Sequence, residues 1–457
     1  MLRGLPSIDR LLAHTLWADA PSIPHHARRD ACRAAVDAAR VELRAGTLPV
    51  APSLDDLVAS ALLAAARADR PQLRRVINGT GVILHTNLGR APLAAAALDA
   101  IAALAGGYLN LEMDLHTGVR DSRHTRLSAS FARIVGCADV VVANNNAAAV
   151  FLALSALARG ERVVVSRGEL VEIGGSFRMP EIMEASGATL VEVGSTNRTH
   201  GADYRRALEA GARVVMKVHR SNFAQIGFTA EVSIEELGAM CREHGALLLH
   251  DLGQGALDHA PGVVGGVGPA ESVRRSLDAG AHVVLFSGDK LLGGPQCGLL
   301  AGDAAVLARV ARHPVMRLVR PGKLTLIALE ATLQAWARDP SGGLVPAARL
   351  LVRTEDELRG AAEALAARLR ALEAEWDVSV APTRSAPGGG ALPAMALPSY
   401  AVSVHDPHRS EEALAAALRD GDPAVVGRLE GGRLLLDLRT LLPGDEDGVV
   451  AAFIALR

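Results

Sequence analysis

The spacing of hydrophobic positions divides the chain into three parts. In residues 1–70 apolar side chains recur every three to four positions, as at Ile8, Leu11 and Leu12. This spacing is typical of amphipathic helices, and prolines separate the segments. We therefore predict a small helical N-terminal domain over residues 1–70, although a bundle whose charges are merely solvated fits the pattern equally well.

Between residues 71 and 330 short apolar runs alternate with helical stretches. Six runs have the length of strands: Val140–Ala143, Arg162–Val165, Thr189–Val193, Val214–Val218, Ala246–His250 and Val283–Phe286. Continuous apolar runs with helices between them predict a parallel sheet that is covered on both faces. Ligands of such α/β sheets bind at the carboxyl ends of the strands, so the polar residues that follow these runs are the first candidates for a site.

The last part, residues 331–457, has a mixed pattern. A long helical stretch begins after Leu324, and a second helix is predicted over 354–376. Short strands, a Gly/Pro-rich loop at 385–393 and a final helix at 446–456 follow. This order predicts a compact α+β C-terminal domain, and the whole chain is expected to be of the α/β class.

Composition and charge narrow the function. The net charge of −2 argues against a general polyanion binder, but residues 1–75 hold eleven Arg against eight acidic residues, a mild local basic excess. The four cysteines are widely spaced, so we expect neither a metal site nor a disulfide framework, and a reducing cytoplasm fits. The N-terminus is too polar for a signal peptide, and no apolar run approaches the ~20 residues of a membrane span.

Lysine is scarce in this arginine-rich chain. Only Lys217, Lys290 and Lys323 occur among 48 basic residues, so each is a candidate for chemistry that Arg cannot perform. In the stretch VVLFSGDKLLGGPQCG a strand ends and Lys290 follows in a glycine-flanked turn, as a lysine that binds pyridoxal phosphate (PLP) covalently requires. Ser287 beside it is a candidate for the cofactor phosphate. A surface lysine in a flexible loop is the alternative.

Three further stretches carry residues suited to the same cofactor. In LLLHDLGQG, Asp251 follows a buried strand, and PLP needs an acid beside its ring nitrogen; an Asp that caps the following loop is the alternative. In VVVANNNAAAV the backbone of Asn145, Asn146 and Ala147 opens a helix, which suits a phosphate but also describes an ordinary N-cap. His219 follows another strand and is a candidate for ring or substrate contact, or a structural residue.

Taken in this order, these stretches resemble the bacterial selenocysteine synthases, the L-seryl-tRNA(Sec) selenium transferase family. The resemblance also rests on LPSIDRLL, RRVINGTGVILHTNLGRAPL, SRGELVEIGGSFRMPEIMEASGATLVEVGSTNRTH and HPVMRLVRPGKLTLIALEA, and covers residues 5–12 and most of 74–335. It implies an aminotransferase-like fold-type-I core with PLP on Lys290, an N-terminal domain that binds tRNA, and a ring-shaped homodecamer of dimers. Gln254 and Cys297 depart from the family pattern, which usually has Ser and Ala there.

The resemblance also implies an activity: β-elimination of the serine hydroxyl from L-seryl-tRNA(Sec), then addition of selenium from selenophosphate to give L-selenocysteinyl-tRNA(Sec). Arginine forks suit such an anion, and Arg90, Arg317 and Arg320 are the candidates, although isolated arginines in this chain are also compatible with simple solvation. Three more arginines, in TGVRDSRHTR, are candidates for phosphate or RNA: Arg120, Arg123 and Arg126.

Two other functions share parts of this pattern. A PLP-dependent lyase or transferase acting on a free amino acid would use the same Lys290 and Asp251, but it has no need of the N-terminal helical segment. A tRNA-binding protein without catalysis would keep that segment, but it would have no need of the lysine and the aspartate.

Overall fold

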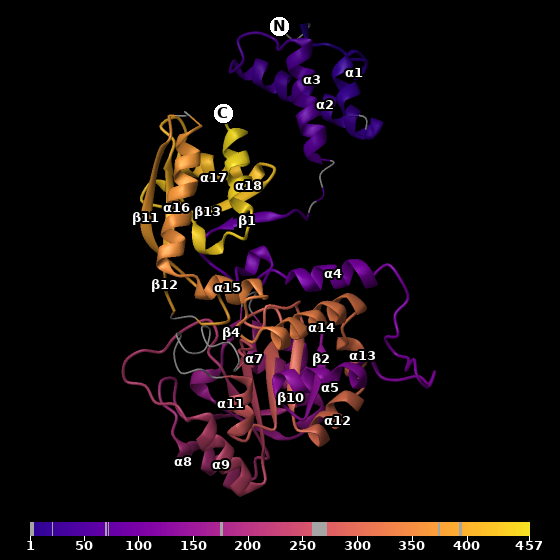
Figure 1. Cartoon of the computed structure of the whole chain (residues 1–457), viewed down its shortest axis with the longest axis vertical. Helices are drawn as coiled ribbons and strands as arrows, with labels where there is room; N and C mark the ends of the chain where they lie inside the picture. Colours follow the sequence, from indigo (N-terminus) through magenta and orange to yellow (C-terminus); the bar gives the residue numbers. More distant parts are fainter. Residues whose placement is uncertain are drawn as a thin grey trace. The chain divides into compact units, whose positions relative to one another are not determined.

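The structure is a computed structural model that describes residues 4–20, 22–68, 71, 73–173, 177–257, 272–372, 375–392 and 395–457 (Figure 1). The chain divides into two compact units, Met1–Arg75 and Val76–Arg457. Each unit is described by itself. A further boundary near residue 330, inside the second unit, stays a prediction.

The first unit is helical, as predicted. Its elements are α1 (Ile8–Leu12), the 3-10 helix η2 (Thr15–Asp19), α2 (His25–Ala45) and α3 (Leu54–Ala68). The Ser7 side chain caps α1 by accepting a hydrogen bond from the Arg10 backbone N–H. Leu11, Trp17 and Val58 are buried in one apolar cluster, so this unit has a core of its own.

The second unit contains a seven-stranded sheet with the order β2-β10-β9-β8-β7-β3-β6. Its strands are β2 (Asp139–Ala143), β3 (Arg162–Ser166), β6 (Thr189–Val193), β7 (Val214–Val218), β8 (Leu247–Gly253), β9 (Val283–Ser287) and β10 (Gly298–Gly302). Each of the six predicted runs falls on one of these strands, although β8 begins at Leu247, one residue later than predicted, and extends to Gly253. The predicted parallel pairing is confirmed for β6, β3, β7, β8 and β9, whereas β10, which was not predicted, pairs antiparallel with both β2 and β9. The chain reverses directly after β9, through the turn that holds Lys290, so no crossover helix separates β9 from β10.

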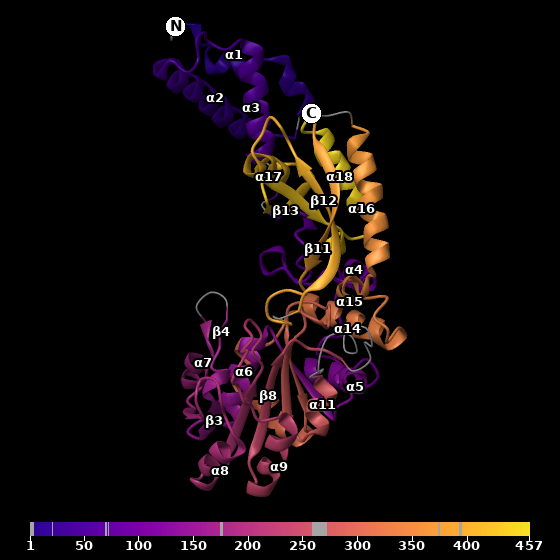
Figure 2. The same ribbon diagram turned by 90° about the vertical axis from the view of Figure 1, so that its left-hand side faces the viewer.

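Helices cover both faces of this sheet. They are α4 (Ala95–Leu104), α5 (Arg123–Val135), α6 (Asn146–Leu157), α7 (Met179–Ala185), α8 (Gly201–Glu209), α9 (Ile234–His244), α11 (Val273–Asp278), α12 (Ala304–Arg312), α13 (Met316–Val319) and α14 (Lys323–Arg338). Figure 2 shows α6 and α7 on one side of β8, with α5 and α11 on the other. Leu248 packs in one apolar cluster and Leu249 in another, which explains why the strand sequences are apolar throughout.

A second, five-stranded sheet forms the α+β part predicted at the C-terminus, with the order β1-β13-β14-β12-β11. Its strands are β1 (Val76–Gly79), β11 (Asp377–Ser385), β12 (Leu397–His405), β13 (Ala424–Glu430) and β14 (Arg433–Asp437). Its helices are α15 (Pro346–Val352), α16 (Glu355–Arg370), α17 (Glu411–Asp420) and α18 (Asp445–Ile454). Small elements complete the unit: η3 (Thr86–Leu88), η4 (Arg167–Glu169), η5 (Leu438–Thr440), β4 (Glu172–Ile173) and β5 (Phe177–Arg178).

The helix predicted over 354–376 is shorter than expected and ends at Arg370. The Arg370 Nε atom donates a hydrogen bond to the Val378 carbonyl, because the chain has already turned back into β11. Trp376 instead packs edge-on against Phe453, with 5.1 Å between ring centroids. The apolar spacing thus continues beyond the helix because Trp376 belongs to the core of the second sheet.

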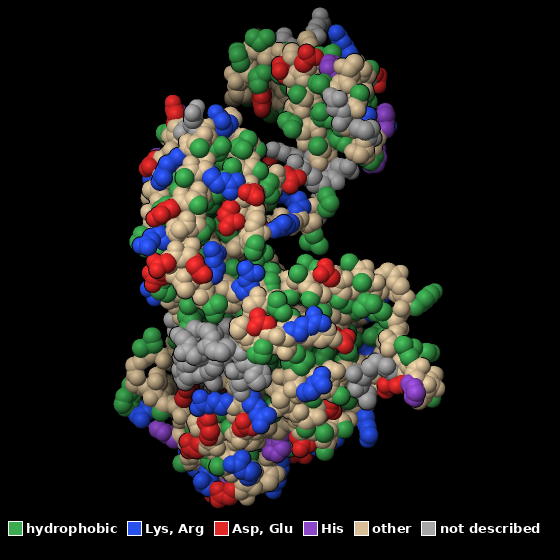
Figure 3. Space-filling model, in the orientation of Figure 1, with side chains coloured by type: hydrophobic (Ala, Val, Ile, Leu, Met, Phe, Trp, Pro, Cys, Tyr) green, Lys and Arg blue, Asp and Glu red, His purple; other side chains and the backbone are tan. Residues whose placement is uncertain are grey.

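Charged side chains of both signs are mixed over the visible face of the second unit, in keeping with the low net charge (Figure 3). Among the described residues, no helix combines the length and hydropathy needed to cross a membrane.

Candidate active site

Lys290 lies in the turn between β9 and β10. Hydrogen bonds from Gly288 N to the Cys297 carbonyl (2.9 Å) and from Gly294 N to the Gly288 carbonyl (2.8 Å) close this turn. A side chain at Gly288 would lie 2.4 Å from Cys297 Sγ, so the sequence needs glycine there. Lys290 is only 9% exposed, and this burial lowers the pKa of its amine below the usual range. A neutral amine is the form that reacts with an aldehyde.

The two other lysines are held by hydrogen bonds. Lys217 Nζ donates to Glu169 Oε1 and to the Val232 carbonyl, each at 3.1 Å, and both charged side chains are buried. Lys323 Nζ donates to the Ala105 carbonyl at 2.7 Å. No hydrogen bond from Lys290 Nζ is formed within the described part of the chain, which favours Lys290 as the reactive lysine.

Asp251 on β8 lies close to this lysine. A side chain added at Gly253 would lie 3.8 Å from Lys290 Nζ and 3.9 Å from Asp251 Oδ1, so the two groups flank the same glycine. Burial raises the pKa of the Asp251 carboxyl, while a hydrogen bond from Asn146 and the positive charge of Lys290 oppose that rise. A cationic ring nitrogen beside Asp251 would offset the cost of burying its charge.

The asparagines at the start of α6 have different roles. Asn145 Oδ1 accepts a hydrogen bond from the Ala148 backbone N–H at 2.8 Å, so the side chain of Asn145 is an N-cap. Asn146 Nδ2 donates to Asp251 Oδ1 at 2.8 Å and thereby orients the carboxylate. Asn146 Oδ1 is buried without a hydrogen-bond partner among the described residues. Phosphate binding by the backbone N–H groups of Asn146 and Ala147 stays a prediction.

His219 and Ser287 also border the site. His219 follows β7, and its backbone N–H donates to the Asp251 carbonyl at 2.9 Å. The charge of its ring is one of the smaller influences that lower the pKa of Asp251 against the effect of burial. Ser287 is the buried last residue of β9. The sequence did not point to Glu169, whose Oε2 atom accepts the Val218 N–H at 3.0 Å and so supports the backbone next to His219.

Arg90 reaches the lysine turn from a distant part of the chain. Its Nη1 atom donates to Asp289 Oδ2 at 2.8 Å, and Asp289 directly precedes Lys290. Arg90 is the one non-glycine residue in the described ranges with a left-handed backbone, at φ 62°. Such strain persists where the surroundings enforce it, and it often marks functional positions. Asp289 was not among the predicted site residues, since its partner is 199 positions away.

A glycine-rich loop from the C-terminal part forms one wall of the lysine site. Gly390 has a left-handed backbone at φ 85°, and a side chain there would lie 2.9 Å from Lys290 Nζ. Its backbone N–H donates to the Ser221 carbonyl at 2.9 Å. The sequence analysis placed this loop at 385–393 without assigning it a role; its residue 393 lies outside the described residues.

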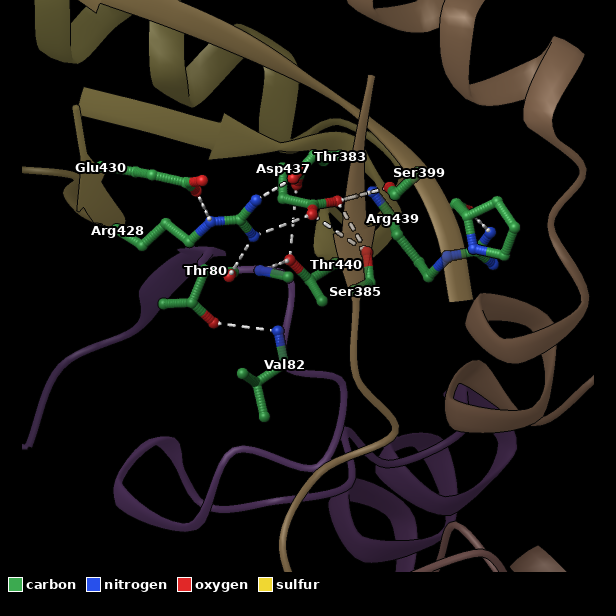
Figure 4. Close-up of polar contacts among 12 residues, drawn as sticks. Thr80, Val82, Thr383, Ser385, Ser399, Arg428, Glu430, Asp437, Arg439 and Thr440 are labelled. Carbon is green, nitrogen blue, oxygen red and sulfur yellow. Dashed lines mark hydrogen bonds and ion pairs between the residues drawn. The ribbon is translucent and has the colours of Figure 1, made fainter. Parts of the chain in front are cut away.

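The base of this loop is fixed by the buried carboxylate of Asp437 (Figure 4). It accepts hydrogen bonds from Ser399 Oγ at 2.7 Å, Ser385 Oγ at 3.0 Å and Arg428 Nη1 at 3.2 Å. Arg428 Nη1 also donates to the Thr80 carbonyl at 3.2 Å. These contacts join β11, β12, β13, β14 and the residue that follows β1 where the loop leaves the second sheet.

Arg317 and Arg320 line a different hollow, of about 540 Å³. Five arginines contribute to its wall: Arg120, Arg123, Arg312, Arg317 and Arg320. Glu112 pairs with Arg123 at 2.6 Å and with Arg320 at 3.3 Å, whereas Arg317 is exposed and forms no ion pair with any described residue. The lining includes none of Arg90, Asp251 and Lys290, so the three predicted donor-binding arginines do not meet here. The Arg126 side chain lies outside the described residues.

The two departures from the family pattern fit their surroundings. Gln254 is buried, its Oε1 atom accepts the Ala256 N–H at 2.8 Å, and its carbonyl accepts the Leu291 N–H at 3.0 Å. Cys297 is fully buried against Gly288. Neither residue displaces a group of the site.

The donor set fits PLP: a buried amine of lowered pKa, a buried carboxylate of raised pKa on the neighbouring strand, and an unsatisfied amide oxygen at Asn146. Fold and site together define a PLP-dependent enzyme with an aminotransferase-like core. The chain belongs to the L-seryl-tRNA selenium transferase family, because residues 76–442 match that family and residues 2–40 match the family described as selenocysteine synthase N terminal.

Curated relatives agree over almost the whole length. The chain is 43% identical to the L-seryl-tRNA(Sec) selenium transferase of Hyphomonas neptunium, over 100% of this chain and 99% of the relative. It is 44% identical to that of Geobacter sulfurreducens, over 98% and 97%. The solved structure of D-glucosaminate-6-phosphate ammonia-lyase covers 83% of this chain and 95% of that chain, with a TM-score of 0.58 and 20% identity, and shows the shared fold.

Proposed function

We propose that this protein converts L-seryl-tRNA(Sec) to L-selenocysteinyl-tRNA(Sec) in the cytoplasm, with selenophosphate as the selenium donor. The observation that carries the proposal is the approach of Lys290 and Asp251 to the same glycine, in a chain that belongs to the L-seryl-tRNA selenium transferase family. Asp251 on β8 and Lys290 in the turn after the adjacent strand β9 would take the two roles that the chemistry requires.

Bound PLP supplies an electron sink for the charge that develops at Cα of the seryl group. Lys290 would hold the cofactor covalently through Nζ. The same Nζ atom would also serve as the base for the Cα proton, and its lowered pKa favours the neutral, basic form. Asp251 would keep a proton on the ring nitrogen, and Asn146 holds the Asp251 carboxylate in position.

The selenium donor is an anion, and the chain offers it two sets of arginines. Arg90 borders Lys290, while Arg317 and Arg320 share the hollow described above. We propose that all three serve selenophosphate. Since they do not meet in one chain, we propose further that a neighbouring subunit of the homodecamer of dimers supplies its hollow to this site. Arg317 has the guanidinium most available to an anion, because Arg320 is already paired with Glu112.

The decisive experiment is turnover of seryl-tRNA(Sec) with selenophosphate by the purified protein, with Lys290→Ala as the inactive control. Formation of selenocysteinyl-tRNA by the wild type alone supports the proposal. Consumption of free L-serine with no reaction of seryl-tRNA would instead assign the protein to the PLP enzymes of free amino acids. Binding of tRNA without turnover of either substrate would leave it a tRNA-binding protein.

A further inference from the structure

A polar cluster is buried at the end of β14 and consists of Asp437, Arg439 and Thr440; we call it the β14 cluster. Asp437 is the last residue of the strand, and the other two lie in η5, which follows directly. Their exposed fractions are 0%, 2% and 2%. Ionised groups are expensive to bury without hydrogen-bond partners, so the partners of this cluster indicate what it maintains.

The second unit has two sheets, and its chain passes between them in three places. The segment after β1 leads to the first sheet, α15 links α14 to α16, and the glycine-rich loop between β11 and β12 extends to Lys290. The helix α14 packs in the core of the first sheet, whereas α16 packs in the core of the second. The β14 cluster is hydrogen-bonded to all three segments, and each of them also reaches the turn of Lys290.

The glycine-rich loop is bound at its base by the carboxylate of the cluster (Figure 4). Ser385, the last residue of β11, donates a hydrogen bond from Oγ to Asp437 Oδ1 at 3.0 Å. Further along the loop, a side chain at Gly390 would lie 2.9 Å from Lys290 Nζ. The position of this wall of the site therefore depends on a contact made inside the second sheet.

The segment after β1 is bound by the hydroxyl of the cluster. Thr440 Oγ1 accepts the Gly81 N–H at 3.1 Å. The Gly81 carbonyl in turn accepts the Ala386 N–H at 2.8 Å, so this segment and the glycine-rich loop are held together. The segment continues to Arg90, whose guanidinium donates to Asp289 next to the lysine. It thus supplies a second wall of the site.

The helix α15 is bound by the guanidinium of the cluster. Arg439 Nη1 donates to the Leu350 carbonyl at 2.9 Å, near the C-terminal end of α15. At the other end of this helix, Val345 occupies the space that a side chain at Gly293 would need. The Gly293 N–H donates to the Lys290 carbonyl at 2.9 Å, so α15 supports the turn itself.

We propose that the β14 cluster positions Lys290 indirectly, by anchoring the three segments that surround its turn and so keeping water away from its amine. Among the described residues, the charged groups that act on this amine are Asp251, Arg90 and Asp289. The cluster contributes none of them, so its influence is transmitted through the segments rather than by charge. The inference rests on the proposed function for the role of Lys290 in catalysis.

Loosening one of the anchors should expose the amine. Burial is the largest cause of the lowered pKa of Lys290, so entry of water should raise that pKa toward the ordinary lysine value. Less of the amine is then neutral at neutral pH, and its reaction with the PLP aldehyde should be slower. Movement of a wall by roughly half to one ångström would slow covalent attachment about ten- to a hundredfold.

The test measures the pH at which Lys290 becomes reactive in the full-length protein before PLP is added. Acetic anhydride labels neutral amines, and mass spectrometry gives the labelled fraction of Lys290 at each pH. Ser385→Ala and Thr440→Val each remove one anchor, and both should move the midpoint of labelling upward. Thr440→Ser keeps the hydroxyl and should retain the wild-type midpoint.

The matched control is Ser403→Ala. Ser403 is also buried in the second sheet, and within the described residues its Oγ atom accepts a hydrogen bond from Arg433 Nε, at 2.6 Å, rather than bonding to the β14 cluster. This variant loses a buried hydroxyl of the same kind and should keep the wild-type midpoint. Thermal unfolding measured in parallel establishes that each variant is folded during labelling.

A midpoint that is unchanged in either Ser385→Ala or Thr440→Val overturns the inference. So does an equal shift in Ser403→Ala, because the cluster would then contribute only to the stability of the second sheet. The labelling does not depend on the catalysed reaction. If the midpoints shift as expected but PLP attaches to another lysine, the proposed function of Lys290 fails while the inference about the cluster stands.

Discussion

Replacing Gly390 with alanine tests whether the C-terminal glycine loop positions Lys290, the proposed reactive lysine. Gly390 has φ +85°, and the added Cβ would lie 2.9 Å from Lys290 Nζ and 3.1 Å from Lys290 Cε. The left-handed backbone alone costs a residue with a side chain about 1–2 kcal/mol. Because the clashing atoms form the end of a flexible side chain, Lys290 should move and the loop should stay.

The required movement follows from the contact distances. Ordinary contact begins at 3.4 Å, so Nζ must retreat by about 3.4 − 2.9 = 0.5 Å. A misplacement of 1 Å costs on the order of a hundredfold in rate, so about half an ångström should slow covalent attachment of PLP about tenfold. Gly389→Ala is the matched control: it lies in the same loop without a left-handed backbone, and its Cβ would meet only Thr86 Oγ1, at 4.0 Å.

The assay mixes the cofactor-free protein with PLP, stops samples with borohydride, and follows the labelled fraction at Lys290 by mass spectrometry. Thermal unfolding measured in parallel should show a loss of stability for Gly390→Ala and little change for Gly389→Ala. Equal labelling rates for Gly390→Ala, Gly389→Ala and the wild type would refute the reasoning, since Gly390 would then not form the wall of the lysine site.

Four further outcomes are expected. Burial lowers the pKa of Lys290, so the rate of PLP attachment should rise with pH through a midpoint below that of a free lysine amine; a midpoint at the ordinary value would contradict the buried setting. Asp251→Asn should retain PLP, as seen by absorbance, but exchange the Cα proton of the seryl group far more slowly, since an amide cannot keep the ring nitrogen protonated. Arg317→Ala should raise the selenophosphate requirement about ten- to a hundredfold while elimination of the hydroxyl continues, whereas Arg309→Ala, on the exposed side of α12, should not. Deleting residues 1–75 should leave a PLP-binding protein with little affinity for tRNA, and a normal gel shift would show that this unit has another role.

Much of the fold was predictable because it depends on local pattern. Apolar runs of strand length gave the strands, since a residue buried on both faces of a sheet must be apolar. The turn at Lys290 was visible from its glycines, and Asp251 from its position after such a run. The fold-type-I core and the family followed from the order of these stretches along the chain.

The antiparallel strand β10 was not predicted from the sequence. Its five residues, Gly298–Gly302, are bounded by glycine and resemble a loop. The direction of a strand depends on which neighbours it pairs with, and this is decided by the turn geometry after β9. The end of α16 was also predicted too late. The apolar spacing continues to Trp376 because this side chain packs against Phe453, a tertiary contact that the sequence pattern does not distinguish from a helical one.

The sequence by itself determined the family of this protein and its cofactor class, and it predicted which lysine carries the cofactor and which acid accompanies it. Only the tertiary structure decided the partners of these groups. Asn146 orients Asp251 from 105 positions away, Arg90 pairs with Asp289 from 199 positions away, and Gly390 borders Lys290 from the C-terminal part. The type of each residue reflects what its own position requires, so it can be seen directly in the sequence. Proximity between distant segments arises only when the sheets and helices pack, and no local pattern records it.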